Sequence, residues 1–275
     1  MMPRFHAGLG VAALLAGACA RSTPTPAITI TATDYAFAAP ETIPAGVVTL
    51  RLVNRGRELH HAVLVRLEAG KTAADFQAAA QAIMQQHAAP PEWISFAGGP
   101  NTVDPVDTAE VTETLEPGVY VLFCVIPGPD GIPHVAKGMF RTLVVAGGAA
   151  SRAEPATTNV LTLSDYDFRF QTPLTAGTHV IRVDNSGPQV HEVVLAELRP
   201  GKSIQDFLAW EAGGEKGPPP VGRWQGGVAA LDSVRHAVWT LTVRPGRYLL
   251  LCFWPDAADG KPHLVHGMVK EIAVS

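Results

Sequence analysis

Two stretches of the chain carry the same three reactive side chains in the same order. Residues 124–139 read CVIPGPDGIPHVAKGM, and residues 252–268 read CFWPDAADGKPHLVHGM. Nine residues separate Cys from His in the first stretch and ten in the second, and four separate His from Met in both. Sulfur is scarce elsewhere, since the chain has only three Cys and five Met. Thiolate, imidazole and thioether are donors for soft metal ions, although two Cys can also form a disulfide.

Each half of the chain contributes a further His, which opens an apolar segment. His60 stands six residues after Asn54, and His191 stands six residues after Asn185. Both are followed by runs of Val, Leu and Ala, which are typical of a buried strand. Each half therefore carries a set of two His, one Cys and one Met.

The repetition extends over nearly the whole chain. DYAF (34–37) recurs as DYDF (165–168), NRGRELHHAVL (54–64) as NSGPQVHEVVL (185–195), EAGKTAADF (68–76) as RPGKSIQDF (199–207), and PGVYVLFC (117–124) as PGRYLLLC (245–252). The offset is 131 residues for the first three pairs and 128 for the last. Self-similarity at a nearly fixed offset indicates duplicated domains. We predict a first domain over residues 28–146, a Gly/Ala/Pro-rich linker over 147–158 and a second domain over 159–275.

Strand patterns dominate both domains. Apolar, β-branched and aromatic runs bounded by Gly, Pro and Asn occupy residues 28–37, 47–54, 61–67 and 118–124, and again residues 159–168, 179–185, 191–198 and 246–252. One helical segment interrupts each domain, at residues 72–87 and, in a shorter form, at 203–210. The pattern predicts an all-β chain of two tandem β-sandwiches, each with one inserted helix.

An Asn and a Gly ahead of a strand-opening His, followed late in the domain by a Cys…His…Met loop, resembles the cupredoxin, or type 1 (blue) copper, family of plastocyanin and azurin. The resemblance covers both repeats nearly end to end and implies two cupredoxin-like Greek-key β-sandwiches. It also implies one type 1 copper per domain, two in total. The ligands it implies are His60, Cys124, His134 and Met139 for one copper, and His191, Cys252, His263 and Met268 for the other.

The donor set suits copper on chemical grounds as well. Thiolate and thioether favour Cu(I) and imidazole holds Cu(II), so such a site accommodates both oxidation states. Two features depart from the small carriers of this family. The Cys-to-His loop is longer, closer to that of copper nitrite reductase, and can shield the copper edge. The residue after the first His, often Asn in the small carriers, is His61 in one domain and Glu192 in the other. Strand alternation points His61 away from the face of His60, so His61 is left out of the ligand set.

Two other roles for the Cys residues are weaker. Cys124 and Cys252 end equivalent inward-facing rows of their domains, and a disulfide would need their Cα atoms within about 7 Å across a domain boundary. Zinc accepts one Cys and two His, but it would leave each Met without a role.

The N-terminal segment is expected to direct export. Residues 1–18 have one early Arg, a short apolar core and small residues, which is typical of a signal peptide. The sequence LAGAC resembles a lipobox, so we predict lipidation of Cys19 and a tether over residues 19–27; cleavage at Ala18-Cys19-Ala20 as an ordinary A-x-A site is the alternative. The chain would then be a membrane-anchored lipoprotein that faces the periplasm or the cell exterior.

The expected function is single-electron transfer between exported partner proteins, whose identity the sequence does not give. A copper storage, delivery or sensing protein would use the same ligands. A multicopper oxidase or nitrite reductase is less favoured, because no H-x-H pair occurs and no His adjoins either Cys; on this basis we expect that the chain is not an enzyme. The net charge of −4 without a basic run argues against nucleic acid as a partner.

Overall fold

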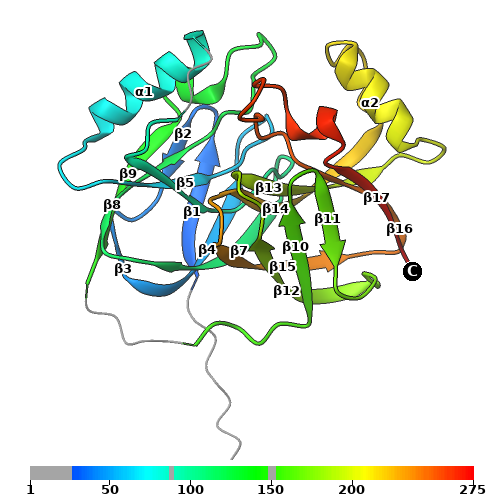
Figure 1. The fold of residues 1–275 in the computed structure, drawn as a ribbon, viewed down its shortest axis with the longest axis horizontal. Coiled ribbons are helices and arrows are strands. Elements are labelled where there is room, and N and C mark those ends of the chain that lie inside the picture. Colours follow the sequence, from blue (N-terminus) through cyan, green and yellow to red (C-terminus); the bar gives the residue numbers. More distant parts are fainter. Residues whose placement is uncertain (1–26, 87–89, 148–152) are drawn as a thin grey trace, which may run out of the picture.

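The computed structural model describes residues 27–86, 90–147 and 153–275. The expected signal peptide, Cys19 and nearly all of the expected tether lie outside these residues, as does part of the expected linker. Within them strands predominate, and the two α-helices lie at one end of the molecule (Figure 1). None of the helices described is both long enough and apolar enough to cross a bilayer.

The first half contains one α-helix among its strands. Its elements are β1 (Ile28–Thr33), β2 (Ala36–Ala38), β3 (Thr42–Pro44), β4 (Gly46–Asn54), β5 (Val63–Leu67), α1 (Ala73–Gln86), β6 (Ile94–Gly98), β7 (Thr108–Leu115), β8 (Gly118–Phe123), the 3-10 helix η1 (His134–Lys137) and β9 (Phe140–Ala146). The side chains of Thr72 and Asp75 bond reciprocally to each other's backbone N–H, which caps the first turn of α1. Phe76 of α1 packs on Phe123, the last residue of β8, with their ring centroids 5.0 Å apart.

The second half repeats this order with a shorter helix. Its elements are β10 (Asn159–Ser164), β11 (Asp167–Phe170), β12 (Gly177–Asn185), β13 (His191–Leu198), α2 (Ile204–Ala212), β14 (Val221–Leu231), β15 (His236–Val243), β16 (Gly246–Leu251), the 3-10 helix η2 (His263–His266) and β17 (Val269–Val274). A capping box of Ser203 and Asp206 starts α2. The three-residue difference between the repeats falls between residues 76 and 98, a range that includes most of the longer helix α1, because the motif GGPNTVD (98–104) recurs as GGVAALD (226–232) at the shorter offset.

Strands of both halves join into two continuous sheets. One sheet has the order β11-β10-β12-β15-β7-β4-β1-β2, and the other has the order β17-β16-β13-β14-β6-β5-β8-β9-β3. The joints are antiparallel β15–β7 and β14–β6 pairs, so each joining strand meets its own counterpart in the repeat. The halves therefore associate as two copies of one subunit do about a two-fold axis.

Alternation along the strands places the core between the two sheets. In β4 the side chains of Val48, Leu50 and Leu52 are buried and those between them are more exposed. The β1–β4 and β10–β12 pairs are parallel, whereas most neighbouring strands are antiparallel. Such mixed pairing arises when a connection crosses between the sheets of a sandwich, as in Greek-key folds. The expected all-β architecture with one helix per half is confirmed.

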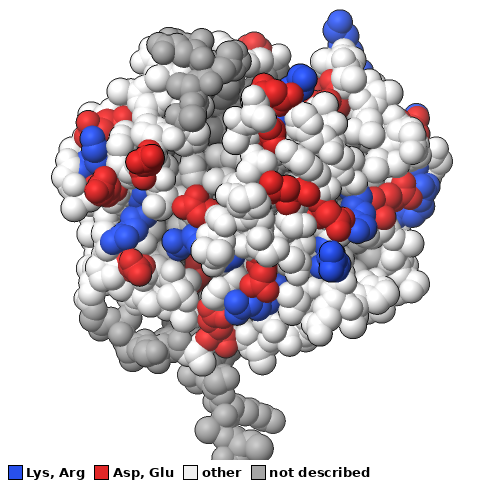
Figure 2. Space-filling view, in the orientation of Figure 1, with Lys and Arg blue, Asp and Glu red and all other residues white. Residues whose placement is uncertain are grey.

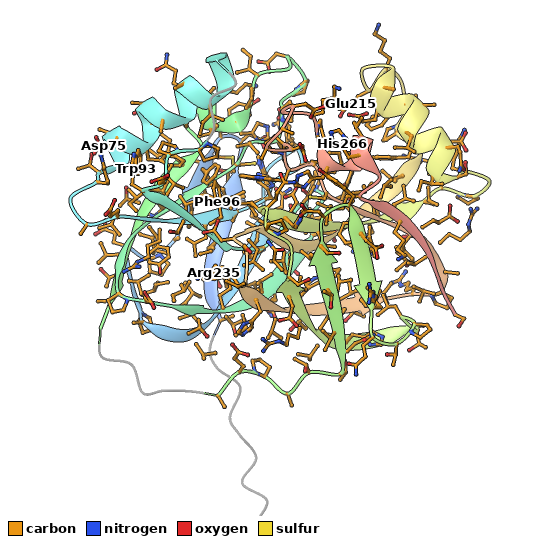
Figure 3. All side chains as sticks on the ribbon, in the orientation of Figure 1. Asp75, Trp93, Phe96, Glu215, Arg235 and His266 are labelled. Atoms are coloured by element: carbon orange, nitrogen blue, oxygen red, sulfur yellow. The ribbon has the colours of Figure 1, made fainter. Side chains whose placement is uncertain are left out.

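Aromatic and charged contacts reinforce the contact between the halves. The ring of Phe96, at the centre of the molecule in Figure 3, meets Trp254 edge-on with centroids 4.6 Å apart. Arg223 binds both carboxylate oxygens of Asp107 at 2.9 and 3.0 Å. Bidentate contacts of this kind fix geometry more strictly than single ion pairs do.

Charges of both signs intersperse on the face shown in Figure 2. Exposed ion pairs of this kind each contribute about 0–1 kcal/mol, so the buried sheets carry most of the stability.

Candidate metal centres

Three side chains from separate parts of the first half meet in its interior. His60 pairs with Val103 in a short bridge ahead of β5, Cys124 directly follows β8, and His134 opens η1. One donor atom from each of His60, Cys124 and His134 lies within 4.8 Å of the other two, and all three residues are fully buried. Cys124 Sγ is 3.4 Å from His134 Nδ1. Strand ends far apart in sequence thus bring together one thiol and two imidazoles.

The second half forms the same group at equivalent positions. His191 opens β13, Cys252 follows β16 and His263 opens η2. Their donor atoms also lie within 4.8 Å of one another, and the residues are fully buried. Cys252 Sγ is 3.5 Å from His263 Nδ1. Both Cys are free thiols, so the disulfide alternative does not apply.

A short hairpin places the second His of each group. In the first half, His134 N–H donates to the carbonyl of Ile126, and Pro127 pairs with Pro133 across the loop. In the second half, His263 N–H donates to the carbonyl of Trp254. Pro fixes its own φ and restricts the residue before it, which stiffens the approach to each His.

The two Met residues lie beside the Cys residues of their groups. Gly138 ends η1 with a positive φ of 97°, and the turn it makes brings the chain back to Cys124. Cys124 N–H then donates to the Met139 carbonyl at 3.2 Å, and Cys252 N–H donates to that of Met268 at 3.2 Å. Both Met residues are fully buried. The backbone of each Met is thus held next to the Cys and the second His of its group.

A carboxylate fixes the tautomer of the first His in each group. His60 Nε2 is 2.9 Å from Asp34 Oδ1, and His191 Nε2 is 2.7 Å from Asp165 Oδ1. A carboxylate accepts, so Nε2 carries the proton in both rings and Nδ1 keeps its lone pair. Carboxylates that orient ligand imidazoles in this way are typical of metal sites.

Polar groups also cover the outer edge of the second His. His134 Nε2–H donates to Glu58 Oε2 at 2.8 Å, and Tyr35 donates its hydroxyl to the other oxygen of Glu58 at 2.9 Å. His263 Nε2 lies 3.4 Å from Gln189 Oε1, a longer contact. The Nε2 edges therefore face polar partners, and the Nδ1 atoms face the Cys.

The Cys thiol lies beside Nδ1 of the second His in each group, but within the described part of the chain the Nδ1 atom of the first His has no N–H or O–H donor. His60 Nδ1 is buried and has no hydrogen-bond partner among the described residues. His191 Nδ1 and His263 Nδ1 are 3.0 Å apart. With protons on Nε2, these two atoms place lone pairs against each other, which is unfavourable unless a cation lies close by. A bound metal ion would supply that cation.

Burial favours the uncharged forms of three of the imidazoles and of both thiols in the absence of a metal. Burial lowers the pKa values of His60 and His191, and it lowers that of His263 to about 4. Burial raises the pKa of the Cys124 thiol to about 12 and raises the pKa of Cys252 as well. Neutral imidazoles are ready to bind a metal, whereas each thiol must lose a proton to do so.

Copper fits this donor set better than zinc does. One thiolate and two imidazoles with a buried Met beside them are the donor types of the His₂Cys arrangement with a weak axial Met. Zinc can take the Cys and two His but leaves the thioether without a role. The fully buried Met residues therefore favour copper.

Glycine is required where the chain passes each His–carboxylate pair. A Cβ on Gly56 would lie 2.2 Å from Asp34 Oδ1 and 2.5 Å from His60 Nε2. A Cβ on Gly187 would lie 2.7 Å from His191 Nε2 and equally close to its carboxylate. These glycines belong to the N-x-G segments that precede the His, so the spacing of that motif has a steric cause at the site.

The sequence analysis did not identify the carboxylates that contact the His residues of each group, which are Asp34, Asp165 and Glu58. Asp34 and Asp165 belong to the repeated DYAF and DYDF segments, which served there only as evidence of duplication. Their recurrence ahead of a strand turn was the available signal. Glu58 gave no such signal, because the corresponding residue of the second half is Gln189.

A third group of potential ligands lies near the surface, although one member, Asp256, is buried. Asp256, Asp259 and His266 bring donor atoms within 4.8 Å of one another, and His266, labelled in the upper half of Figure 3, is the last residue of η2. Asp259 already contacts Lys261 and His266, both at 3.0 Å. We interpret the group as an ion-pair cluster.

Solved structures of copper proteins match parts of this chain at low sequence identity. An auracyanin from Roseiflexus castenholzii matches 45% of this chain over 99% of its own length, with 23% identity and a TM-score of 0.32. A copper nitrite reductase from Nitrosomonas europaea matches 92% of this chain over 94% of its own, with 14% identity and a TM-score of 0.27. A blue copper oxidase from the same organism matches 90% over 85%, with 13% identity and a TM-score of 0.23. No protein-family model and no curated protein matches the chain.

The strand topology and the position of a His–Cys–His group at the strand ends of each half make the fold cupredoxin-like, as expected from the sequence. Auracyanins correspond to about one half of the chain, and the nitrite reductase spans both halves. One expectation from the sequence is wrong. The similar two-half structures are enzymes by name, nitrite reductases and oxidases, so the lack of an H-x-H pair does not show that this chain is not an enzyme.

Proposed function

We propose that the chain is an exported protein that binds one type 1 copper in each half and transfers single electrons between partner proteins. The observation that carries the proposal is the paired His–Cys–His group with Nδ1 lone pairs directed inward and Nε2 protons held by acceptors. When bound, copper supplies a one-electron couple. The ligands proposed are His60, Cys124, His134 and Met139, and His191, Cys252, His263 and Met268.

The protein's contribution is a rigid, dry and oriented donor set. Asp34 and Asp165 prevent the first imidazole of each group from rotating. Cys124 sits in an apolar core with Leu64, Leu122 and Met139, which limits water at the sulfur. A site whose donors do not move on oxidation or reduction loses little energy to reorganisation, as electron transfer requires.

An electron can reach each site from outside through the Nε2 edge of its second His, which polar groups cover. The other route runs through the interior of the protein. His134 is covered by Glu58 and Tyr35, and Lys137 lies 4.3 Å above the Tyr35 ring. The equivalent edge at His263 is met by Tyr166, edge-on at 5.7 Å between centroids. A polar, capped edge of this kind suits a partner that docks through charged or hydrogen-bonding groups.

Copper reconstitution tests the proposal. The metal-free protein should bind two equivalents of Cu(II), turn intensely coloured through thiolate-to-copper charge transfer, and accept two electrons per chain reversibly in a coulometric titration. A colourless protein that binds only Cu(I) would support storage or delivery instead. Turnover of nitrite or of a phenol with oxygen would support an enzyme and refute a role confined to carrying electrons.

We further propose that the mature chain begins at a lipidated Cys19 and is anchored to a membrane outside the cytoplasm. The proposal comes from the apolar N-terminal segment and the LAGAC sequence. Mass spectrometry of the mature N terminus tests it. A diacylglyceryl mass on Cys19 is expected, and a free N terminus at another residue would refute lipidation.

A further inference from the structure

The residue after the first His of each site reaches toward the opposite half of the molecule. His61 follows His60, and Glu192 follows His191. Both are buried polar side chains that lie outside the ligand groups. Their hydrogen-bond partners form a continuous bridge from one site to the other.

The bridge begins beside the Cys of the first site. Val125, the residue after Cys124, donates its N–H to His61 Nε2 at 2.9 Å. Nε2 is therefore the acceptor nitrogen of a neutral ring, and Nδ1 carries the proton. Nδ1–H donates to Asn101 Oδ1 at 3.3 Å.

Asn101 occupies the contact between the halves and is fully buried. Its Nδ2 donates to Glu192 Oε2 at 3.1 Å, and it also lies 3.2 Å from the carbonyls of Val193 and Val228. Its Oδ1 accepts from Thr102 N–H at 2.8 Å. These contacts leave the amide one orientation, in which oxygen faces the first site and nitrogen faces the second.

The bridge ends beside the Cys of the second site. Glu192 Oε1 accepts the N–H of Phe253, the residue after Cys252, at 3.0 Å. The counterpart of Asn101 in the repeat is Ala229, which has no polar side chain. The duplication therefore yields one bridge, made of different residues on its two sides.

We propose that this bridge, Val125–His61–Asn101–Glu192–Phe253, carries an electron between the two copper sites, so that the chain acts as a two-centre relay. The inference rests on the proposed function. Four hydrogen bonds and the short covalent stretches between them join the two thiolates, and bonded paths couple electron donors and acceptors more strongly than gaps between packed atoms do. The step is balanced: one electron leaves Cu(I) in one half and reduces Cu(II) in the other, and no bond or proton changes place.

A single isosteric change interrupts the bridge. Glu192 must accept at both oxygens, from Asn101 and from Phe253. Glu192→Gln offers one acceptor and one NH₂ group, so a donor faces a donor at one end in either orientation. Glu113→Gln is the matched control, because Glu113 is also buried and accepts from Gly99 N–H but lies outside the bridge.

The test measures intramolecular electron transfer in the copper-loaded protein after a flash delivers less than one electron per chain. Cys124→Ala and Cys252→Ala supply the reference visible and EPR spectra and the potential of each single site. The wild type should show a first-order redistribution phase that does not depend on protein concentration. Since a donor–donor contact leaves a gap longer than a hydrogen bond, this phase should slow by roughly tenfold in Glu192→Gln, after correction for the measured potentials, and stay unchanged in Glu113→Gln.

Several results would overturn the relay. They are an unchanged rate in Glu192→Gln, an equal loss in both variants, or a wild-type redistribution that depends on protein concentration. Asn101→Leu, which removes both central links, should slow the phase further provided that its EPR spectrum shows both sites intact. Failure to load two coloured coppers would instead refute the proposed function, which keeps the two failures distinct.

Discussion

A methyl group added at Gly56 should weaken copper binding in the first site alone. The ideal Cβ of Gly56→Ala lies 2.2 Å from Asp34 Oδ1 and 2.5 Å from His60 Nε2, whereas ordinary contacts begin near 3.4 Å. Asp34 or His60 must move by about 1 Å, which takes their 2.9 Å contact out of hydrogen-bond range. Loss of a hydrogen bond to a charged group costs about 1.5–3 kcal/mol. Outer-ligand changes of this kind typically cost about 10–100-fold in metal affinity.

Two matched glycines serve as controls. Gly187→Ala makes the same change in the second site, where the ideal Cβ is 2.7 Å from His191 Nε2, so its effect should be smaller and confined to that site. At Gly147 the added Cβ meets nothing within 4 Å, so Gly147→Ala should leave both sites unchanged.

The assay is a competitive Cu(II) titration followed by the charge-transfer absorption. Gly56→Ala should show one equivalent bound with wild-type affinity and one bound 10–100-fold more weakly. Wild-type affinity at both sites would show that the Asp34–His60 contact does not orient the ligand. An equal loss at both sites would show that the variant acts through the fold rather than through the site.

Three further predictions concern stoichiometry, pH and stability. Cys124→Ala should bind one equivalent of copper and keep the EPR signal of the second site, and loss of both signals would contradict independent sites. Because burial raises the pKa of Cys124 to about 12, the thiol must lose a proton to bind, so copper affinity at the first site should rise about tenfold per pH unit between about pH 7 and 9; a flat profile in Cys252→Ala would refute thiolate ligation. Burial raises the pKa of Glu113 from 4.5 to about 8, so its contribution to stability is complete below pH 4.5 and is lost as pH rises through 8. The wild type should therefore lose up to roughly 5 kcal/mol in its free energy of unfolding between acid and alkaline pH, and Glu113→Gln should not show this loss. Denaturant melts at both pH values measure it, and an equal loss in the two proteins would contradict the prediction.

Local patterns in the sequence predicted the strands and the helices well. The alternation in residues 47–54 corresponds to β4, and the helical segment at 72–87 corresponds to α1. These features depend on near neighbours in the chain, which periodicity records directly. The four residue types of each proposed site also stood out, because Cys and Met are rare in this chain.

Contacts between distant segments could not be predicted in the same way. Asp34 reaches His60 across 26 residues, and Asn101 reaches Glu192 across 91. The counterpart of Asn101 in the second half is Ala229, so a comparison of the two halves gave no sign that Asn101 has a role. The joining of β7 to β15 depends on how two halves dock, which leaves no periodic signal in either half.

The departures from the small carriers acquire a physical reason in the structure. His61 and Glu192 stand where those carriers often have Asn, and each accepts the N–H of the residue after its Cys. Each side chain therefore ties the loop after its Cys to the segment that carries the first His. The change lets each side chain use its other polar atom to reach Asn101.

Anomalous scattering from crystals of the copper-loaded protein at the copper absorption edge tests the central claim most directly. Two peaks per chain are predicted, each within bonding distance of one Sγ and two Nδ1 atoms, at His60, Cys124 and His134 and at His191, Cys252 and His263. Copper bound through Nε2 atoms, copper only at the surface group of Asp256, Asp259 and His266, or an empty pair of His–Cys–His groups would contradict it.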